Sequence, residues 1–170
     1  MPRFIDFTLE DDEKILASAP FNRRKMRRAE KKAMRVTTFW IRGQLQKRIP
    51  VATGQTRGRM TDRVEERGNE ILGIAGGKSM SSDGFNILRG LEGGTGIYGP
   101  KKQRIVPVRA RVLRFVVSGA PVAGTGGNVV FARSVKGMKP RRPFKKTKKE
   151  EGNRARRLFV RQLRKEVNRT

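Results

Sequence analysis

Apolar and small residues recur every three or four positions over residues 23–48, which predicts a long amphipathic helix. Its other face is almost entirely Lys and Arg, a pattern shared by membrane-surface helices, partner-binding helices and ordinary surface helices. We favour the last, because Trp40 and Phe39 lie near the end of the helix beside a turn signal, as expected of core anchors, with Trp40 closing the helix onto a sheet. Pro50 ends the helix because it lacks a backbone donor. The predicted buried face comprises Met26, Ala29, Ala33, Val36, Thr37, Trp40 and Gln44, with Met34, Ile41 and Leu45 widening it.

Short apolar or alternating runs predict strands over residues 60–64, 70–75, 87–91 and 112–117, and Val129, Phe131 and Val135 continue the same sheet. The first two runs flank a turn signal at Gly68-Asn69. The stretch over residues 98–144 is therefore expected to supply the sheet core and much of the cationic surface. Glycine-rich links over 76–84 and 119–127 are predicted loops.

A second amphipathic helix is predicted towards the C-terminus, from Asn153 or earlier to Val167, with Gly152 as a weak point. Its outer face is again basic. Two helices with a small antiparallel sheet define the expected fold class, α+β.

Residues 1–22 form a predicted N-terminal arm, and residues 23–170 a single α+β domain. The arm holds the densest acidic patch of the chain, Glu10 to Glu13, between apolar positions at 4–7 and at 15–16. Such an arm docks on a neighbouring molecule or caps its own basic helix, and the sequence leaves both open.

The charge of the chain gives information about its partners instead of its fold. There are 41 Lys and Arg against 15 Asp and Glu, a net charge of +26. Residues 1–99 carry a net charge of +7 and residues 100–170 a net charge of +19. So strong an excess calls for a polyanion, with nucleic acid the leading candidate and the second half its main contact. For any single lysine a solvated face or an acidic protein neighbour is the simpler explanation.

The chain lacks the residues that several functional classes require. The chain has no Cys and no His, so disulfides and thiolate chemistry are excluded and a zinc site is not expected. No apolar run approaches the ~20 residues of a membrane span, and the N-terminus lacks a secretory h-region. We therefore expect a protein made in a reducing cytoplasm, or carried in a particle assembled there.

No catalytic constellation is evident, and no cofactor is expected. Thr53 and Thr56 have no nearby base to activate them. A nuclease would need clustered carboxylates, but the second half holds only Glu150, Glu151 and Glu166. The run over residues 92–100 is rich in glycine, yet it lacks the Lys-Ser/Thr of a phosphate-binding loop, so we interpret it as a mobile loop.

The order of several short motifs resembles the tail-completion, or head-to-tail connector, proteins of long-tailed double-stranded DNA phages. The shared signposts are a proline-x-x-threonine-glycine corner, a glutamate-x-glycine-threonine turn, a leucine-x-phenylalanine strand and a proline-phenylalanine entry to the last helix. The resemblance covers about residues 23–170. Its main positions are Pro50, Thr53, Gly54, Glu92 to Thr95, Leu113, Phe115, Phe131, Pro143 and Phe144.

The resemblance implies an α+β subunit, two helices on a small antiparallel sheet, that forms a hexameric ring in the phage neck. It is not an enzyme there. The implied partners are other copies, neighbouring neck, portal-adaptor and tail-tube or tail-terminator proteins, and passing double-stranded DNA, with no membrane. The implied location is the virion, assembled in the host cytoplasm. This chain departs from the pattern in its heavy basic charge and its long loops, so its DNA-facing surface is not carried over from the family.

Seven cations flanking the predicted strands are our candidates for sequence-independent phosphate contact. A ribosomal or other basic RNA-binding protein is the alternative, and aromatic residues on a sheet face for base stacking would favour it. Here the single Tyr and the single Trp are far apart in the sequence, and most Phe residues lie in apolar runs. The seven candidates are Lys101, Lys102, Arg104, Arg141, Arg142, Lys145 and Lys146.

Overall fold

The structure, a computed structural model, describes residues 4–7, 23–50, 54–81, 84–116 and 129–169. The chain divides into two compact units, which we call unit 1 (Met1–Leu88 and Arg142–Thr170) and unit 2 (Arg89–Arg141). Helices and antiparallel strands occur together, so the predicted α+β class is confirmed. The predicted partition into an arm and one domain stays a prediction.

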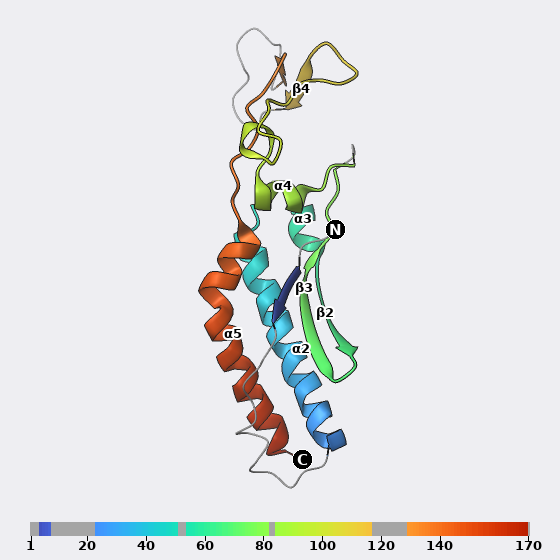
Figure 1. Cartoon of the computed structure of the whole chain (residues 1–170), viewed down its shortest axis with the longest axis vertical. Coiled ribbons are helices and arrows are strands. Elements are labelled where there is room, and N and C mark those ends of the chain that lie inside the picture. Colours follow the sequence, from blue (N-terminus) through green and yellow to red (C-terminus); the bar gives the residue numbers. More distant parts are fainter. Residues whose placement is uncertain (1–3, 8–22, 51–53, 82–83, 117–128, 170) are drawn as a thin grey trace. The chain divides into compact units, whose positions relative to one another are not determined.

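Two long helices dominate unit 1. Helix α2 spans Arg23–Arg48 as predicted, and helix α5 spans Pro143–Val167 without a break at Gly152. They lie side by side with opposite chain directions (Figure 1). Helix α5 begins at Pro143 because the fixed φ of proline suits the first helical turn, where its missing donor costs nothing.

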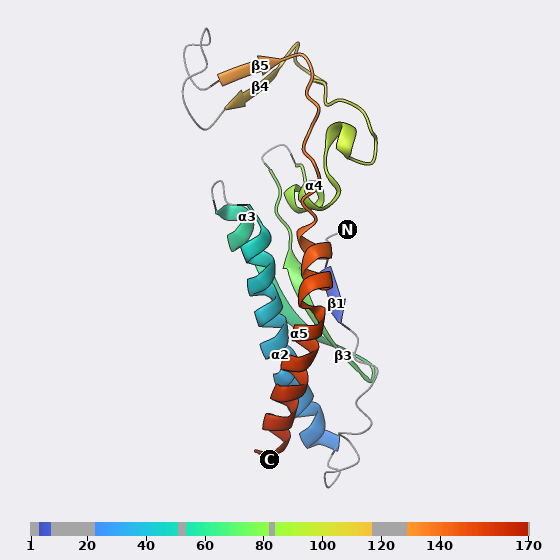
Figure 2. The ribbon, with the colours of Figure 1, turned by 90° about the vertical axis from the view of Figure 1, so that its left-hand side faces the viewer.

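A three-stranded antiparallel sheet lies against these helices, in the order β1-β3-β2. Strand β2 (Met60–Arg67) and strand β3 (Glu70–Gly77) form the predicted hairpin, and Gly68 supplies the positive φ of its turn. Strand β1 (Phe4–Phe7) pairs with β3 within the same chain (Figure 2). Residues 4–7 of the predicted arm are therefore a strand of this sheet, whereas its acidic part lies outside the described residues.

The core of unit 1 lies where the two helices meet each other and the sheet. Small side chains on α2 allow Phe159 of α5 to pack closely. Gly73 of β3 lies under α2, where a Cβ would collide with the side chains of Thr38 and Met34. Thr38 is buried because its hydroxyl donates to the Met34 carbonyl at 2.7 Å. The central cluster comprises Ala29, Ala33, Met34, Phe159 and Leu163.

The predicted buried face of α2 is partly wrong. Val36 is 44% exposed, Phe39 is 59% exposed, and Trp40 is only half-buried instead of a fully buried anchor. Helix α2 contacts the sheet as well as α5, so its buried stripe also includes Thr38, which the sequence pattern does not predict.

Two predictions about strands between residues 87 and 132 are wrong. Residues 87–91 belong to helix α4 (Ile87–Gly93), since a short apolar run does not distinguish a buried strand from a helix. Strands β4 (Leu113–Val116) and β5 (Val129–Ala132) exist, but they form a separate two-stranded sheet. Residues 98–144 therefore do not supply the core of the main sheet.

Candidate nucleic-acid interface

Acidic side chains in unit 1 are bound to neighbouring cations. Glu66 pairs with both Arg27 and Lys31, and Asp62 accepts from Arg42 at 2.5 Å. Further carboxylate–cation pairs join Glu65 to Arg63 and Arg67, and Lys32 to Glu166. These carboxylates therefore offset part of the positive charge of α2, at Arg27, Lys31 and Lys32.

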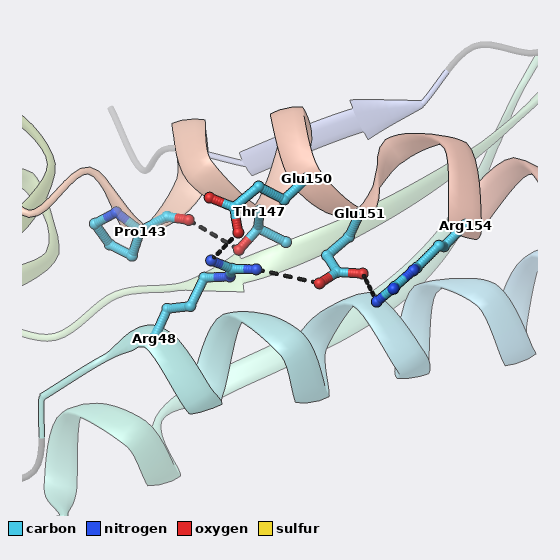
Figure 3. A network of polar contacts seen from close by, with 6 residues as sticks. All are labelled: Arg48, Pro143, Thr147, Glu150, Glu151 and Arg154. Atoms are coloured by element: carbon cyan, nitrogen blue, oxygen red, sulfur yellow. Dashed lines mark hydrogen bonds and ion pairs between the residues drawn. The ribbon is translucent and has the colours of Figure 1, made fainter.

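The most buried of these pairs links the end of α2 to the start of α5 (Figure 3). Arg48 contacts Glu150 at 2.7 Å and Glu151 at 3.1 Å, and Glu151 also accepts from Arg154 at 3.4 Å. The buried Thr147 hydroxyl donates to the Pro143 carbonyl one turn earlier, at 2.8 Å. The network fixes the first turns of α5, from which Lys145 and Lys146 point outward to solvent.

All seven candidate cations are exposed. Lys101, Lys102, Arg104 and Arg141 belong to unit 2, whereas Arg142, Lys145 and Lys146 belong to unit 1. The structure therefore divides the predicted set between two units. Arg104 donates to the Ser134 hydroxyl at 3.3 Å, which ties its loop to the end of β5.

Two of these cations have an unusual backbone. Lys102 has a φ of 49° and Arg142 a φ of 54°, and they are the only non-glycine residues with positive φ among those the structure describes. This left-handed conformation costs an ordinary side chain about 1 kcal/mol or more. Strain of this kind concentrates at functional positions, which singles out Lys102 and Arg142 within the set.

Sequence reasoning did not single out a further basic cluster on the outer face of α5. Arg156, Arg157, Arg161 and Arg164 surround Val160 at a shallow depression of about 430 Å³. The signal in the sequence is that Arg157, Arg161 and Arg164 follow at intervals of four and three residues, which places them on one helix face, with Arg156 adjacent to Arg157.

A second depression, of about 550 Å³, lies between α2 and β2, and we call it the α2–β2 groove. Val36 and Phe39 form its apolar floor, and the Arg42 guanidinium lies 4.5 Å from the Phe39 ring centre. The backbone edge of β2 closes one side. Its lining residues are Arg35, Val36, Phe39, Asp62, Arg63 and Val64.

The glycine-rich turn of unit 2 uses its backbone donors internally. The amides of Thr95 and Ile97 donate to the carbonyls of Met138 and Lys136, each at 2.9 Å, and the Thr95 hydroxyl accepts from the Met138 amide at 2.8 Å. A Cβ at Gly96 would collide with the Lys136 carbonyl. These donors are unavailable to a phosphate, so the run is a packed turn instead of the predicted mobile loop.

Unit 2 is both basic and poorly buried. Residues 89–141 contain 11 Lys and Arg and a single acid, Glu92, which is buried. Among the described residues of this unit, Leu91 is the only large apolar side chain that is buried. By contrast, Val108 is 94% exposed. The other exposed large apolar residues are Ile105, Val106, Val112 and Phe131.

The positions of the family resemblance fall in both units. Gly54 has a φ of 77° and precedes the short helix α3 (Gln55–Gly58), Pro50 is half-buried, and Thr53 lies outside the described residues. Pro143 and Phe144 are buried at the start of α5. Leu113 and Phe115 are half-buried on β4, whereas Phe131 on β5 is 56% exposed.

Within the described ranges, no group of three or more His, Cys, Asp and Glu side chains is placed to hold a metal ion. Nor does any helix there combine the length and apolarity that crossing a membrane needs. Comparison of the chain with protein-family models, curated proteins and solved structures found no match.

Proposed function

We propose that this chain is a structural virion protein of the neck of a long-tailed double-stranded DNA phage. It forms a ring that joins the DNA-filled head to the tail, and it contacts the passing DNA without sequence preference. It is not an enzyme.

The observation that carries the proposal is the packing of family signposts in unit 2. The turn at Gly94 and Thr95 meets residues 136–138, which lead through Pro140 to the start of α5. The Arg141 amide donates to the Leu91 carbonyl at 2.8 Å. The turn over residues 92–95 thus contacts the segment that leads into Pro143 and Phe144, more than 40 positions away in the sequence, which supports treating these motifs as one set.

The surface chemistry supports contact with DNA. The candidate cations are exposed, and backbone phosphates repeat along a duplex whatever its sequence. Exposed large apolar side chains of unit 2 support assembly, because contact with a partner would remove them from water.

Assembly is tested by negative-stain electron microscopy of the purified protein, alone and mixed with tails from the same phage. We expect a monomer or weak oligomer alone, because +26 per subunit opposes association, and a ring at the tail end when tails are present. Tails that acquire no added density would contradict the proposal.

DNA contact is tested by the salt dependence of duplex binding. Alanine at Lys101, Lys102 and Arg104, or at Arg142, Lys145 and Lys146, should lower the slope of log affinity against log salt by about 2–3, since each lost phosphate contact removes about 0.9. The matched control replaces Arg156, Arg157 and Arg161 and removes the same charge. An equal loss in that control would show that net charge, not these positions, governs binding.

Arg142→Gly separates charge from backbone strain. Glycine adopts the positive φ without cost and suits a helix N-cap, so stability should stay level or rise by about 0.5–1 kcal/mol. Duplex affinity should nevertheless fall, with a slope smaller by about 0.9. Unchanged duplex binding would remove Arg142 from the interface.

One observation favours the alternative, a basic RNA-binding protein. Phe131 is exposed on β5 opposite Arg114, as a base-stacking residue would be. Single-stranded RNA and duplex DNA of equal charge distinguish the two functions. Preference for RNA that is lost in Phe131→Ala would favour the alternative.

A further inference from the structure

The α2–β2 groove combines three features that rarely occur together on a free surface. Its floor is apolar, since Phe39 and Val36 are 59% and 44% exposed. Its rim carries two arginines and one acid: Asp62 pairs with Arg42 and Arg63 with Glu65, whereas Arg35 forms no ion pair with the described residues, so the rim has an excess of positive charge. One wall is the outer edge of β2, which among the described strands pairs with β3 alone.

An unpaired strand edge beside an apolar groove is suited to an added extended segment, in which backbone hydrogen bonds supply affinity and side-chain pockets supply specificity. The basic rim requires that the segment be acidic. The apolar floor requires that it also carry large apolar side chains, which a nucleic acid backbone does not offer.

The chain itself contains one segment with this chemistry. Residues 9–16 hold four consecutive carboxylates, from Glu10 to Glu13, flanked by Leu9 on one side and by Ile15 and Leu16 on the other. The remainder of the chain offers no comparable acidic run. Charge and apolar content therefore both match the groove.

Strand order decides which copy supplies the segment. Phe7 pairs with Gly73, and Gly73 pairs with Val64, so a strand outside β2 lies three strand spacings from β1, about 14 Å. Residue 9 is within about 7 Å of Phe7. While β1 is paired, residue 9 of the same chain cannot reach the β2 edge, so a strand that uses all of residues 9–16 at that edge comes from a second copy.

We propose that the α2–β2 groove binds residues 9–16 of a second copy of this chain, paired along the free edge of β2. This inference rests on the proposed function in that a ring brings copies together. The contact is heterologous, since groove and segment are different surfaces, and repeated contacts of this type close into a ring when the rotation between copies permits.

The test uses a fluorescein-labelled peptide of residues 7–17 and the purified full chain, with fluorescence anisotropy as the measurement. Arg35→Ala with Phe39→Ala should weaken peptide binding at least tenfold. Both side chains are exposed, so this variant should fold, which circular dichroism checks. The control, Arg157→Ala with Val160→Ala, removes one cation and one apolar side chain from the other depression and should leave affinity within twofold.

Two further peptides define the specificity. A peptide with Gln and Asn at the four acidic positions, and a scrambled peptide of native composition, should each bind at least tenfold more weakly. Equal binding of the scrambled peptide, or equal losses in both protein variants, would reduce the interaction to general charge attraction and overturn the proposal.

Two other possible occupants of the α2–β2 groove would give different results. If the peptide binds only to a full chain whose own four acids are neutralised, the segment occupies the groove of its own copy, and the assignment to a second copy is overturned. If Arg35→Ala with Phe39→Ala weakens duplex DNA binding as much as it weakens peptide binding, the groove belongs to a polyanion, and the assignment to residues 9–16 is overturned. These binding measurements use neither tails nor rings. A negative result would therefore overturn the groove proposal without bearing on the proposed neck function, which electron microscopy and DNA binding test separately.

Discussion

Unit 1 and unit 2 use similar residue types in opposite ways. In unit 1, two helices and a three-stranded sheet bury Phe159, Leu163 and Ile74, and acidic side chains pair with cations where elements meet. In unit 2, a two-stranded sheet leaves Phe131 exposed and cations have almost no acids beside them. A two-stranded sheet alone is marginally stable in water. The difference is that unit 1 holds its elements together with buried apolar side chains and ion pairs, whereas unit 2 leaves large apolar and cationic side chains exposed.

The chain contains a natural reporter for each unit. Trp40, the only tryptophan, lies on α2 in unit 1, and Tyr98, the only tyrosine, lies in unit 2. Tryptophan fluorescence therefore follows unit 1, and a 19F signal from 3-fluorotyrosine at position 98 follows unit 2.

The largest effect is expected from Phe159→Ala. Phe159 is 5% exposed in the core cluster, so its truncation should lower the free energy of unfolding by about 3–5 kcal/mol. Urea titration followed by Trp40 fluorescence measures this, while the native 19F signal of Tyr98 should stay in place. A variant in which both reporters shift together in all conditions would mean that the units fold as one.

The next largest effect is expected from Arg48→Ala, which should lower the free energy of unfolding by about 3 kcal/mol. The substitution leaves Glu151, which is 7% exposed, without its partner from α2, and an uncompensated buried charge is costly. The control is Arg67→Ala, an exposed pair with Glu65, which should change stability by less than about 1 kcal/mol. Equal effects in urea titrations would show that burial of Glu151 has no role.

A pair of glycine substitutions tests the contact between α2 and the sheet. Gly73→Ala should cost about 1–3 kcal/mol because its Cβ collides with Thr38 and Met34. Gly152→Ala meets nothing within 4 Å inside α5 and should stabilise by about 0.5–1 kcal/mol. Thermal unfolding of both variants measures the difference, and a tolerated alanine at position 73 would place α2 farther from β3.

The smallest stability effect is expected from Phe131→Ala in unit 2. An exposed aromatic residue contributes little to packing, so the free energy of unfolding should change by less than about 0.5 kcal/mol. Trp40 fluorescence should be unaffected throughout. A loss as large as that of Phe159→Ala would show that unit 2 has a core of its own.

Local signals were sufficient where neighbouring residues decide the structure. The period of α2 and the turn at Gly68 follow from helix geometry and from backbone freedom, which are properties of short segments. The cationic character of the surface also follows directly from composition. The run over 87–91 is the counterexample, since its apolar residues fit a strand and a helix equally well.

The sequence by itself determined the helix pair, the β2–β3 hairpin, the α+β class and the excess of positive charge, because each depends on periodicity or on counting. Only the tertiary structure decided that Trp40 lies at the edge of the core, that β4 and β5 form their own sheet, and that carboxylates such as Glu151 are engaged between helices. The physical reason is that the burial and pairing of a residue depend on which distant part of the chain packs against it. The periodicity of the sequence shows only on which side of its own helix or strand that residue lies.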